Sequence, residues 1–120
     1  MNLKTISTTT AEHYAWGEKC HGWFLLKADD IHVIQERMPP GSAEIMHFHS
    51  RARQLFYVLR GTLTMAGAAG SLAVSAGHAV VIEPNFSHRA ENNGAEDVEF
   101  LVISCPPSHQ NRFDGGTARP

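Results

Sequence analysis

Residues 41–61 read GSAEIMHFHSRARQLFYVLRG, a segment with a glycine at each end. His47 and His49 stand two positions apart, and residues with this spacing in an extended chain point to the same side. After a charged loop, Gln54 opens the apolar run 55–59 and shares one strand face with alternate members of that run. The segment therefore predicts two neighbouring imidazoles and a polar amide at the end of an apolar wall.

The rest of the chain predicts further short strands, separated by turn residues. Turn residues separate the apolar runs: Pro-Pro-Gly at 39–41, Pro-Pro at 106–107, and the turns at 76–77 and 83–85. No long helical periodicity is present. The expected strands cover residues 31–38, 55–59, 63–65, 71–74, 79–82 and 98–104. This pattern is typical of an all-β antiparallel sandwich or barrel.

Length and composition limit the function classes. The 120 residues suit a single domain, and ten basic against twelve acidic residues give a net charge of -2, which argues against a nucleic-acid partner. The two cysteines, Cys20 and Cys105, form no CxxC pair, so neither a disulfide scaffold nor a zinc knuckle is expected. No apolar run approaches a membrane span, and the N-terminus lacks a signal-peptide core. We expect a cytoplasmic protein with no membrane partner.

A third histidine follows at a distance. His88 comes after the turn 83–85, and Asn92 lies four positions beyond it. Two histidines at strand spacing and a distant third are a plausible set of ligands for one divalent metal. Asn92 is expected to be structural and to hold a turn or a strand end.

Both halves of this arrangement resemble the two motifs of the cupin family. The first is the series Gly41, His47, His49, Gln54 and Gly61, and the second is Gly77, His88 and Asn92, sixteen positions after Gly61. Together they cover residues 41–92. The resemblance implies a small single-domain cupin: a jelly-roll β-barrel, or double-stranded β-helix, with its site in the barrel mouth.

Carried over to this chain, the resemblance makes His47, His49, Gln54 and His88 the metal ligands. The sequence departs from the family pattern at Gln54, where a glutamate is usual, and at Glu83 and Asn85, where proline and glycine are usual. Asn85 is compatible with the turn, because asparagine tolerates the left-handed conformation.

The replacement of a carboxylate by Gln54 has a chemical consequence. Three neutral imidazoles and a neutral amide leave the full +2 charge of a cation uncompensated, which favours anionic or carbonyl-bearing ligands. We expect one divalent transition metal per chain, with Zn²⁺, Ni²⁺, Fe²⁺ or Cu²⁺ favoured over Mn²⁺. Some small cupins that act on unsaturated uronic acids carry a similar ligand set.

Two functions remain open at this point. The first is a metal-dependent enzyme that acts on a small polar organic or sugar-acid substrate by isomerisation, ring opening or dioxygen insertion. The second is a non-catalytic cupin that binds a small ligand as a sensor or accessory protein. The residues expected to line the pocket are Phe56, Phe100, Val102, Arg51 and Arg53. The alternative for the two arginines is a solvated charged loop. No general acid or base can be assigned among Glu36, Glu44 and Glu83.

The outer parts of the chain are assigned by composition. Residues 1–24 form an N-terminal segment partly packed on the barrel, 25–107 the barrel, and 108–120 a C-terminal tail that is expected to be mobile. Phe48 and Tyr57 fall on the reverse faces of their strands, and aromatic residues there favour a second sheet or a subunit contact. A homodimer is therefore expected, since it would also cover exposed strand edges.

Overall fold

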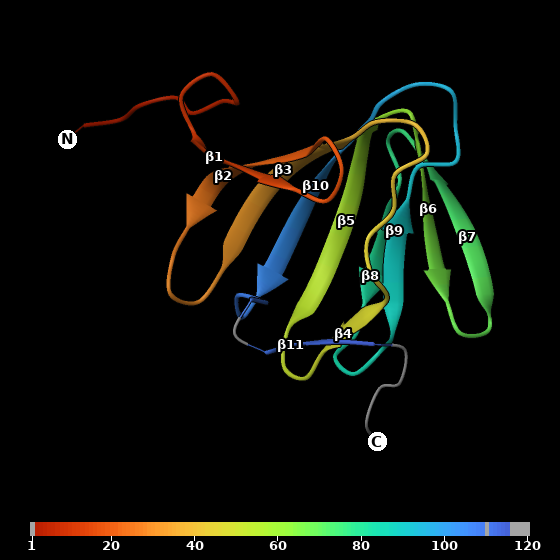
Figure 1. Ribbon diagram of the computed structural model, residues 1–120. Helices are drawn as coiled ribbons and strands as arrows, with labels where there is room; N and C mark the ends of the chain where they lie inside the picture. Colours follow the sequence, from red (N-terminus) through yellow and green to blue (C-terminus); the bar gives the residue numbers. More distant parts are fainter. Residues whose placement is uncertain (1, 110, 116–120) are drawn as a thin grey trace.

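The computed structural model describes residues 2–109 and 111–115, which form two antiparallel sheets facing each other (Figure 1). Six strands make the first sheet, in the order β1-β2-β3-β10-β5-β8, and five make the second, in the order β11-β4-β9-β6-β7. The strands are β1 (Glu12–Trp16), β2 (Cys20–Lys27), β3 (His32–Met38), β4 (His47–His49), β5 (Arg53–Arg60), β6 (Thr62–Gly67), β7 (Gly70–Ser75), β8 (Ala79–Ile82), β9 (His88–Glu91), β10 (Val98–Cys105) and β11 (Arg112–Asp114). The all-β jelly-roll prediction is confirmed.

The core lies between the two sheets. Strand β10 alternates buried and partly exposed residues along its length, which is the pattern of a strand with one face on a core. From β10, Val98, Phe100 and Val102 meet Leu63 and Met65 of β6 across the gap between the sheets. Apolar burial of this kind is the main force that closes the two sheets on each other.

Two turns place the motif residues. Gly61 joins β5 to β6 with φ of 78°, and a Cβ atom there would lie 2.8 Å from the carbonyl oxygen of Asp97, so both conformation and space require glycine. Asn85 adopts φ of 67°, as the sequence predicts, and its backbone N–H donates to the carbonyl oxygen of His49 at 2.7 Å. The turn before β9 is thereby tied to β4.

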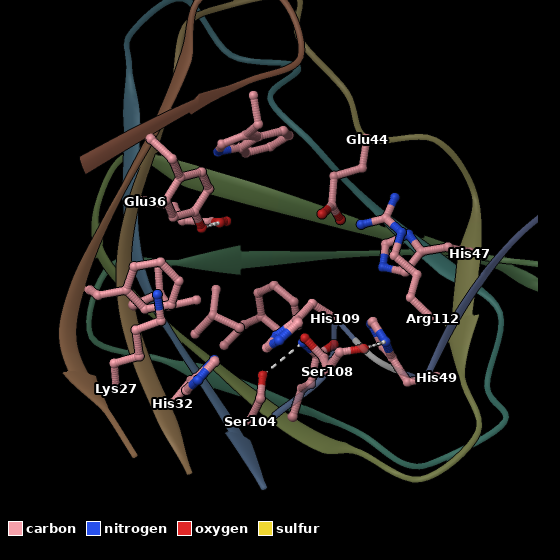
Figure 2. Close-up of a pocket in the computed structure, with 17 residues that line it drawn as sticks. Lys27, His32, Glu36, Glu44, His47, His49, Ser104, Ser108, His109 and Arg112 are labelled. Carbon is pink, nitrogen blue, oxygen red and sulfur yellow. Dashed lines mark hydrogen bonds between the residues drawn. The ribbon is translucent and has the colours of Figure 1, made fainter. Parts of the chain in front are cut away.

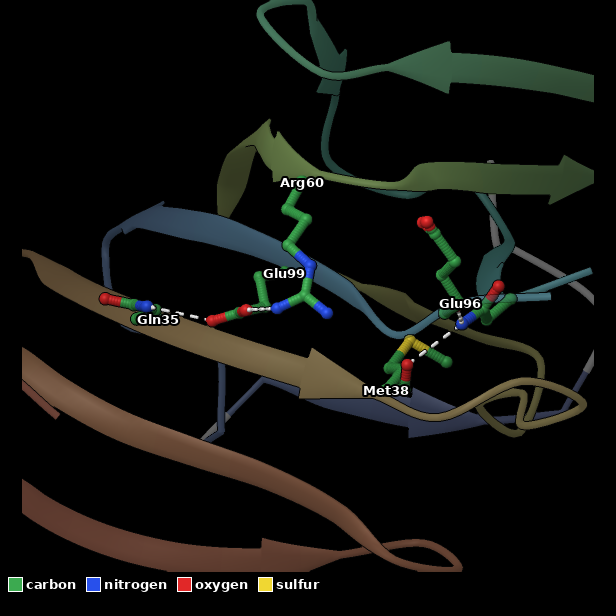
Figure 3. Close-up of polar contacts among 6 residues, drawn as sticks. Gln35, Met38, Arg60, Glu96 and Glu99 are labelled. Carbon is green, nitrogen blue, oxygen red and sulfur yellow. Dashed lines mark hydrogen bonds and ion pairs between the residues drawn. The ribbon is translucent and has the colours of Figure 1, made fainter. Parts of the chain in front are cut away.

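Asn92 has the structural role expected of it. Its side chain is buried, and Nδ2 donates to the carbonyl oxygens of Met38 at 2.9 Å and Glu96 at 2.8 Å. Its Oδ1 accepts the backbone N–H of Gly94. Figure 3 shows Met38 and Glu96 in this network, beside the separate Arg60–Glu99 ion pair on the outer face of the first sheet. Asn92 therefore connects the loop after β9 to the end of β3.

The six strands predicted from sequence are all present, with their ends within about two residues of those expected. Strand β4 falls on the segment 47–49 that was expected to be extended, and four more strands, β1, β2, β9 and β11, were not predicted. The expected boundary between residues 24 and 25 falls inside β2, which pairs with β3 along most of its length. The N-terminal segment is therefore an integral part of the six-stranded sheet.

The expected C-terminal tail contains β11, which pairs with β4 residue for residue. Phe113 of β11 stacks on Phe48 with ring centroids 5.1 Å apart, and Phe48 is only 5% exposed. The sequence left two covers open for Phe48, a second sheet or a subunit contact, and the structure shows instead that the chain's own β11, in the same sheet as β4, covers it. Residues 110 and 116–120 of the tail lie outside the described residues.

Among residues 2–109 and 111–115, no helix has the length and apolar character needed to cross a membrane.

Candidate metal centre

Three buried histidines converge on one end of the barrel. His47 and His49 lie on β4, and His88 opens β9 directly opposite His47 in the antiparallel register. Each imidazole offers one nitrogen within 4.8 Å of the other two. The strand spacing of His47 and His49 puts both rings on the inner face, and the pairing of β4 with β9 adds the third. The cluster could hold a metal ion.

The backbone fixes the orientation of each ring. The Nδ1 atoms of His47 and His88 lie 2.7 Å and 2.8 Å from the carbonyl oxygens of Ile45 and Phe86, two residues earlier in each case. His49 Nδ1 lies 3.3 Å from the carbonyl oxygen of Ser108. Because a carbonyl only accepts, the proton of each neutral ring resides on Nδ1. The lone pair on each Nε2 is then left for a ligand.

Gln54 approaches from the opposite sheet. It lies on β5, and its Nε2 donates to Ser104 Oγ on β10 at 2.9 Å. This hydrogen bond fixes the amide so that Oε1 is the free end. Oε1 is buried without a hydrogen-bond partner, as are the Nε2 atoms of His49 and His88. Orphaned buried acceptors are costly, and they are rare in native proteins without a missing ligand.

Burial keeps the imidazoles neutral. Loss of hydration lowers the pKa of His47 and of His88. The hydrogen bonds to the carbonyl oxygens of Ile45 and Phe86 raise the pKa by a smaller amount. For His49, burial and then the neighbouring rings lower the pKa to about 4. Neutral imidazole is the form that binds a metal, so the cluster is in its binding form at neutral pH.

The residues fit a divalent transition metal. The buried atoms without a hydrogen-bond partner include two imidazole nitrogens and one amide oxygen, which are atoms that can coordinate a metal ion. All four side chains are at most 5% exposed. Their hydrogen bonds to Ile45, Phe86, Ser108 and Ser104 supply the supporting contacts that metal ligands usually have.

A cavity of about 370 Å³ opens in front of this cluster, between the two sheets (Figure 2). Its wall includes His47, His49 and Gln54. Of the residues expected to line the pocket, Phe56 and Val102 do so. The structure does not place the others on this wall: Phe100 is fully buried in the core, Arg53 pairs with Glu83 on the surface at 2.7 Å, and Arg51 lines a separate depression.

The cavity has a second polar wall that sequence reasoning missed. Glu36 of β3 and Glu44 of the loop before β4 both face it, together with Tyr14 of β1. Tyr14 Oη donates to Glu36 Oε2 at 2.7 Å, and Glu44 Oε1 accepts the backbone N–H of Ala90 at 2.9 Å. These residues come together only through strand pairing, which the spacing along the chain does not reveal.

Basic groups line other parts of the same cavity. Lys27, His32 and His109 gather near the ends of β2 and β3, and Arg112 of β11 lies beside His47 (Figure 2). His32 and His109 stack with ring centroids 5.3 Å apart. Lys27 also pairs with Glu12 at 3.1 Å, and Arg112 with Asp114 at 2.7 Å, so neighbouring carboxylates partly neutralise both charges.

The comparisons with known proteins agree with this architecture. The chain is 31% identical to an uncharacterized protein of Methanocaldococcus jannaschii over 75 residues. This match covers 62% of this chain and 60% of that protein. Over 67 residues the chain is 30% identical to an oxalate-binding protein of Thermotoga maritima, 56% of this chain and 55% of the relative. The chain thus matches little more than half the length of these curated relatives.

Among solved structures, the polyketide cyclase RemF of Streptomyces resistomycificus superposes with a TM-score of 0.83 at 16% identity, covering 98% of this chain and 89% of RemF. At that identity the likeness shows the fold alone. The family model for the cupin domain matches residues 34–104, which include both glycine-bounded motifs, the three clustered histidines and Gln54. The chain belongs to the cupin family.

Proposed function

We propose that this cupin holds one divalent transition metal on His47, His49, His88 and Gln54, and acts as a metal-dependent enzyme on a small polar organic substrate. The observation that supports it most is the set of buried acceptors without partners, His49 Nε2, His88 Nε2 and Gln54 Oε1. These atoms are buried and no protein group among the described residues hydrogen-bonds to them, so a bound cation would account for their arrangement.

The donor set favours substrates that carry a carboxylate or a carbonyl. With four neutral ligands, the metal would supply an undiminished +2 charge that polarises a substrate oxygen. Arg112, Lys27 and the stacked His32–His109 pair line the same cavity and would favour an anionic group. A sugar acid or an oxo acid has both features, and the volume of about 370 Å³ suits a molecule of that size.

The reaction classes we propose are isomerisation, ring opening and dioxygen insertion. In each, the residues of this chain bind and orient the substrate: the basic groups hold its anionic end, and the apolar side chains of Phe56 and Val102 exclude water from the reacting end. The cavity has imidazoles on one side and carboxyl groups on another. This arrangement suits reactions in which a carboxyl group transfers a proton while an electron pair of the substrate shifts toward its polarised oxygen.

The alternative is a non-catalytic cupin that binds a small anion. It is favoured by the relative from Thermotoga maritima, which is named an oxalate-binding protein. The same cavity would serve this function, since a dicarboxylate could bind both the cation and the basic residues. The two functions therefore differ in turnover and not in the site.

The test uses metal-loaded protein and a panel of unsaturated uronates, 1,3-diketones, flavonols and oxalate. Turnover of a panel member, lost in the His47→Ala/His49→Ala double variant and kept in His78→Ala, is the expected result. His78 is an exposed histidine on the turn before β8, so it controls for loss of any imidazole. Thermal stabilisation by a compound that is never turned over would favour the binding protein.

We also propose that the protein is a homodimer. The outer edges of β1 and β8 end the six-stranded sheet, and no strand among the described residues pairs with them. Tyr57, Leu59 and Val81, on β5 and β8, are 38%, 43% and 49% exposed. Light scattering on the purified protein should give twice the mass of the chain, and a monomer mass at micromolar concentration would contradict this.

A further inference from the structure

We propose that Glu36, held by Tyr14 across Gly22, is the acid–base residue of this site; this role rests on the enzymatic function proposed above. The two sides of the cavity then divide the work: the imidazoles and Gln54 hold a cation, and Glu36 holds the proton that the substrate exchanges.

Strand pairing lines up the three residues that carry the inference. Tyr14 of β1 stands opposite Gly22 of β2, and Gly22 stands opposite Glu36 of β3. Directly paired residues lie on the same face of a sheet, which here is the inner face that lines the cavity. A side chain at position 22 would normally separate its two neighbours in this row.

Gly22 leaves the space that Tyr14 fills. A Cβ atom at position 22 would lie 2.2 Å from Cζ of Tyr14 and 2.5 Å from its Oη, so the phenol ring lies directly over this glycine. Its hydroxyl reaches across β2 and donates to Glu36 Oε2 at 2.7 Å. A glycine in the middle of a strand weakens that strand, and a close approach of this kind is a usual reason for its presence.

Glu36 faces the cavity from the β3 side, whereas His47 and His49 face it from β4 (Figure 2). The charged and titratable groups around it are Tyr14 from β1, Cys20 from β2, Glu44 from the loop before β4 and Arg112 from β11. Its neighbour on β10 in the register is Phe100, which carries no charge. A substrate in the cavity would therefore meet two carboxyl groups, and of these Glu36 is the one that a side-chain hydroxyl holds, whereas Glu44 is held by a backbone N–H.

The surroundings keep this carboxyl protonated near neutral pH. Burial, and then the nearby Glu44, raise the pKa of Glu36 to about 8, against lowering effects of the Tyr14 hydrogen bond and Arg112. A group whose pKa lies close to the working pH can both donate and accept a proton, which is the property that acid–base catalysis needs.

The proton transfer balances without a further reactant. The O–H bond of Glu36 breaks and leaves its electron pair on the carboxylate, while a lone pair on the substrate oxygen that gains negative charge forms the new bond to the proton. In an isomerisation, the Glu36 carboxylate then takes a proton from the adjacent carbon, and the C–H bonding pair moves into the substrate. Glu36 is neutral again at the end.

The first test is an infrared titration of the metal-free protein, which reads the C=O stretch of protonated carboxyl groups and needs no activity. The wild type should lose such a band with a midpoint at about pH 8. Burial also raises the pKa of Glu44, which can contribute a band of its own, so Glu36 is read by difference. The component with this midpoint should be absent in Glu36→Gln and unchanged in Glu96→Gln, which makes the same chemical change at an exposed position. A titration of the carboxyl band that is identical in Glu36→Gln and the wild type, or ionisation of Glu36 near its ordinary pKa, would overturn the assignment.

Two further variants test the role of the glycine and also cover the case in which Glu36→Gln fails to fold. Tyr14→Phe removes a donor that favours the carboxylate, so the midpoint should rise. Gly22→Ala displaces the phenol ring and should move the midpoint in the same direction. Midpoints that stay unchanged in both variants would show that Tyr14 does not hold Glu36.

The last test uses the panel compound that the metal-loaded protein turns over. Glu36→Gln should lower kcat by about 10²–10⁴-fold with little change in KM, and Tyr14→Phe should shift the pH profile of kcat upward. Full activity in Glu36→Gln would overturn the acid–base role while the enzymatic function stands. A carboxyl band with a midpoint at about pH 8 in a protein that turns over no panel compound would instead overturn the enzymatic function, and the catalytic role with it.

Discussion

The two polar walls of the cavity are both buried, and the pKa values of their side chains shift in opposite directions. On β4 and β9, loss of hydration lowers the pKa of the histidines, most clearly that of His49, to about 4. On β3, loss of hydration raises the pKa of Glu36 to about 8. Both shifts favour the neutral form, because a charge is costly in a poorly hydrated site.

The difference lies in what each neutral group can then offer. A neutral imidazole whose Nδ1–H is held by a carbonyl presents a lone pair, so the histidine wall attracts a cation. A neutral carboxyl group presents a proton, so the Glu36 wall is a donor. One physical effect thus prepares two chemically complementary surfaces, and this complementarity is what the following predictions test.

The largest expected effect is on the histidine wall. The His47→Ala/His49→Ala double variant removes two of three imidazoles, and the site should lose its metal, with affinity weakened more than about 100-fold. The wild type should carry close to one transition metal per chain by elemental analysis, as should the surface variant His78→Ala. Equal metal content in the wild type and the double variant would place the metal elsewhere.

The next effect concerns stability against pH. Glu36 has a folded-state pKa raised to about 8 from 4.5, so the folded protein binds more protons than the unfolded chain in that window. The stability contribution of Glu36 is therefore fully present below pH 4.5 and is lost as pH rises to about 8. Glu36→Gln should flatten this alkaline decline, by about 1–3 kcal/mol in the free energy of unfolding of the metal-free protein.

The histidines act on the acid side with the opposite sign. Since the folded-state pKa of His49 is lowered from 6.5 to about 4, its stability contribution is present above pH 6.5 and is lost as pH falls through that window. Glu36→Gln should keep this loss of stability at acid pH. Denaturant unfolding at a series of pH values would measure the free energy of unfolding for both proteins. If Glu36→Gln loses as much stability between pH 4.5 and about 8 as the wild type does, the two walls do not differ as described.

A third prediction alters the charge of the metal ligands. Gln54→Glu would replace a neutral oxygen donor by a carboxylate and reduce the net charge of a divalent site from about +2 to about +1. Metal preference should shift toward Mn²⁺ and Fe²⁺, measured by competition binding. If the preference is unchanged, Gln54 is not a metal ligand and the cation rests on the imidazoles alone.

The smallest effect concerns the support of that amide. Ser104→Ala removes the acceptor that holds Gln54 Nε2 at 2.9 Å, so that the amide is free to rotate. Metal affinity should fall by about tenfold, the range typical for a residue that orients a ligand. Calorimetric titration would measure it, with Ser71→Ala on the exposed part of β7 as the control. No change would mean that the hydrogen bond does not position Oε1.

The sequence was sufficient for the parts of the site that depend on local spacing. Strand periodicity predicts that His47 and His49 share a face, and the turn residues 83–85 predict the break in the chain before His88. The apolar runs at 55–59 and 98–104 mark the two central strands because they are bounded by glycine and proline.

The remainder depends on pairings between distant segments. The carbonyl that holds His49 comes from Ser108, and Arg112 enters the cavity on β11, both within a polar segment whose composition gives no strand signal. Tyr14 and Glu36 lie 22 positions apart and meet only across β2. The one local signal for that wall was Gly22, a glycine between aromatic residues in an otherwise bulky strand.

The central claim is that the imidazoles of His47, His49 and His88 and the amide of Gln54 surround one cation. X-ray absorption at the metal edge of the protein purified from metal-replete cells tests this most directly. We predict three imidazole nitrogens at about 2.0–2.1 Å with at least one oxygen, and one fewer nitrogen in His88→Ala. A wild-type protein without metal, or a metal shell dominated by sulfur or by water oxygens, would contradict the account.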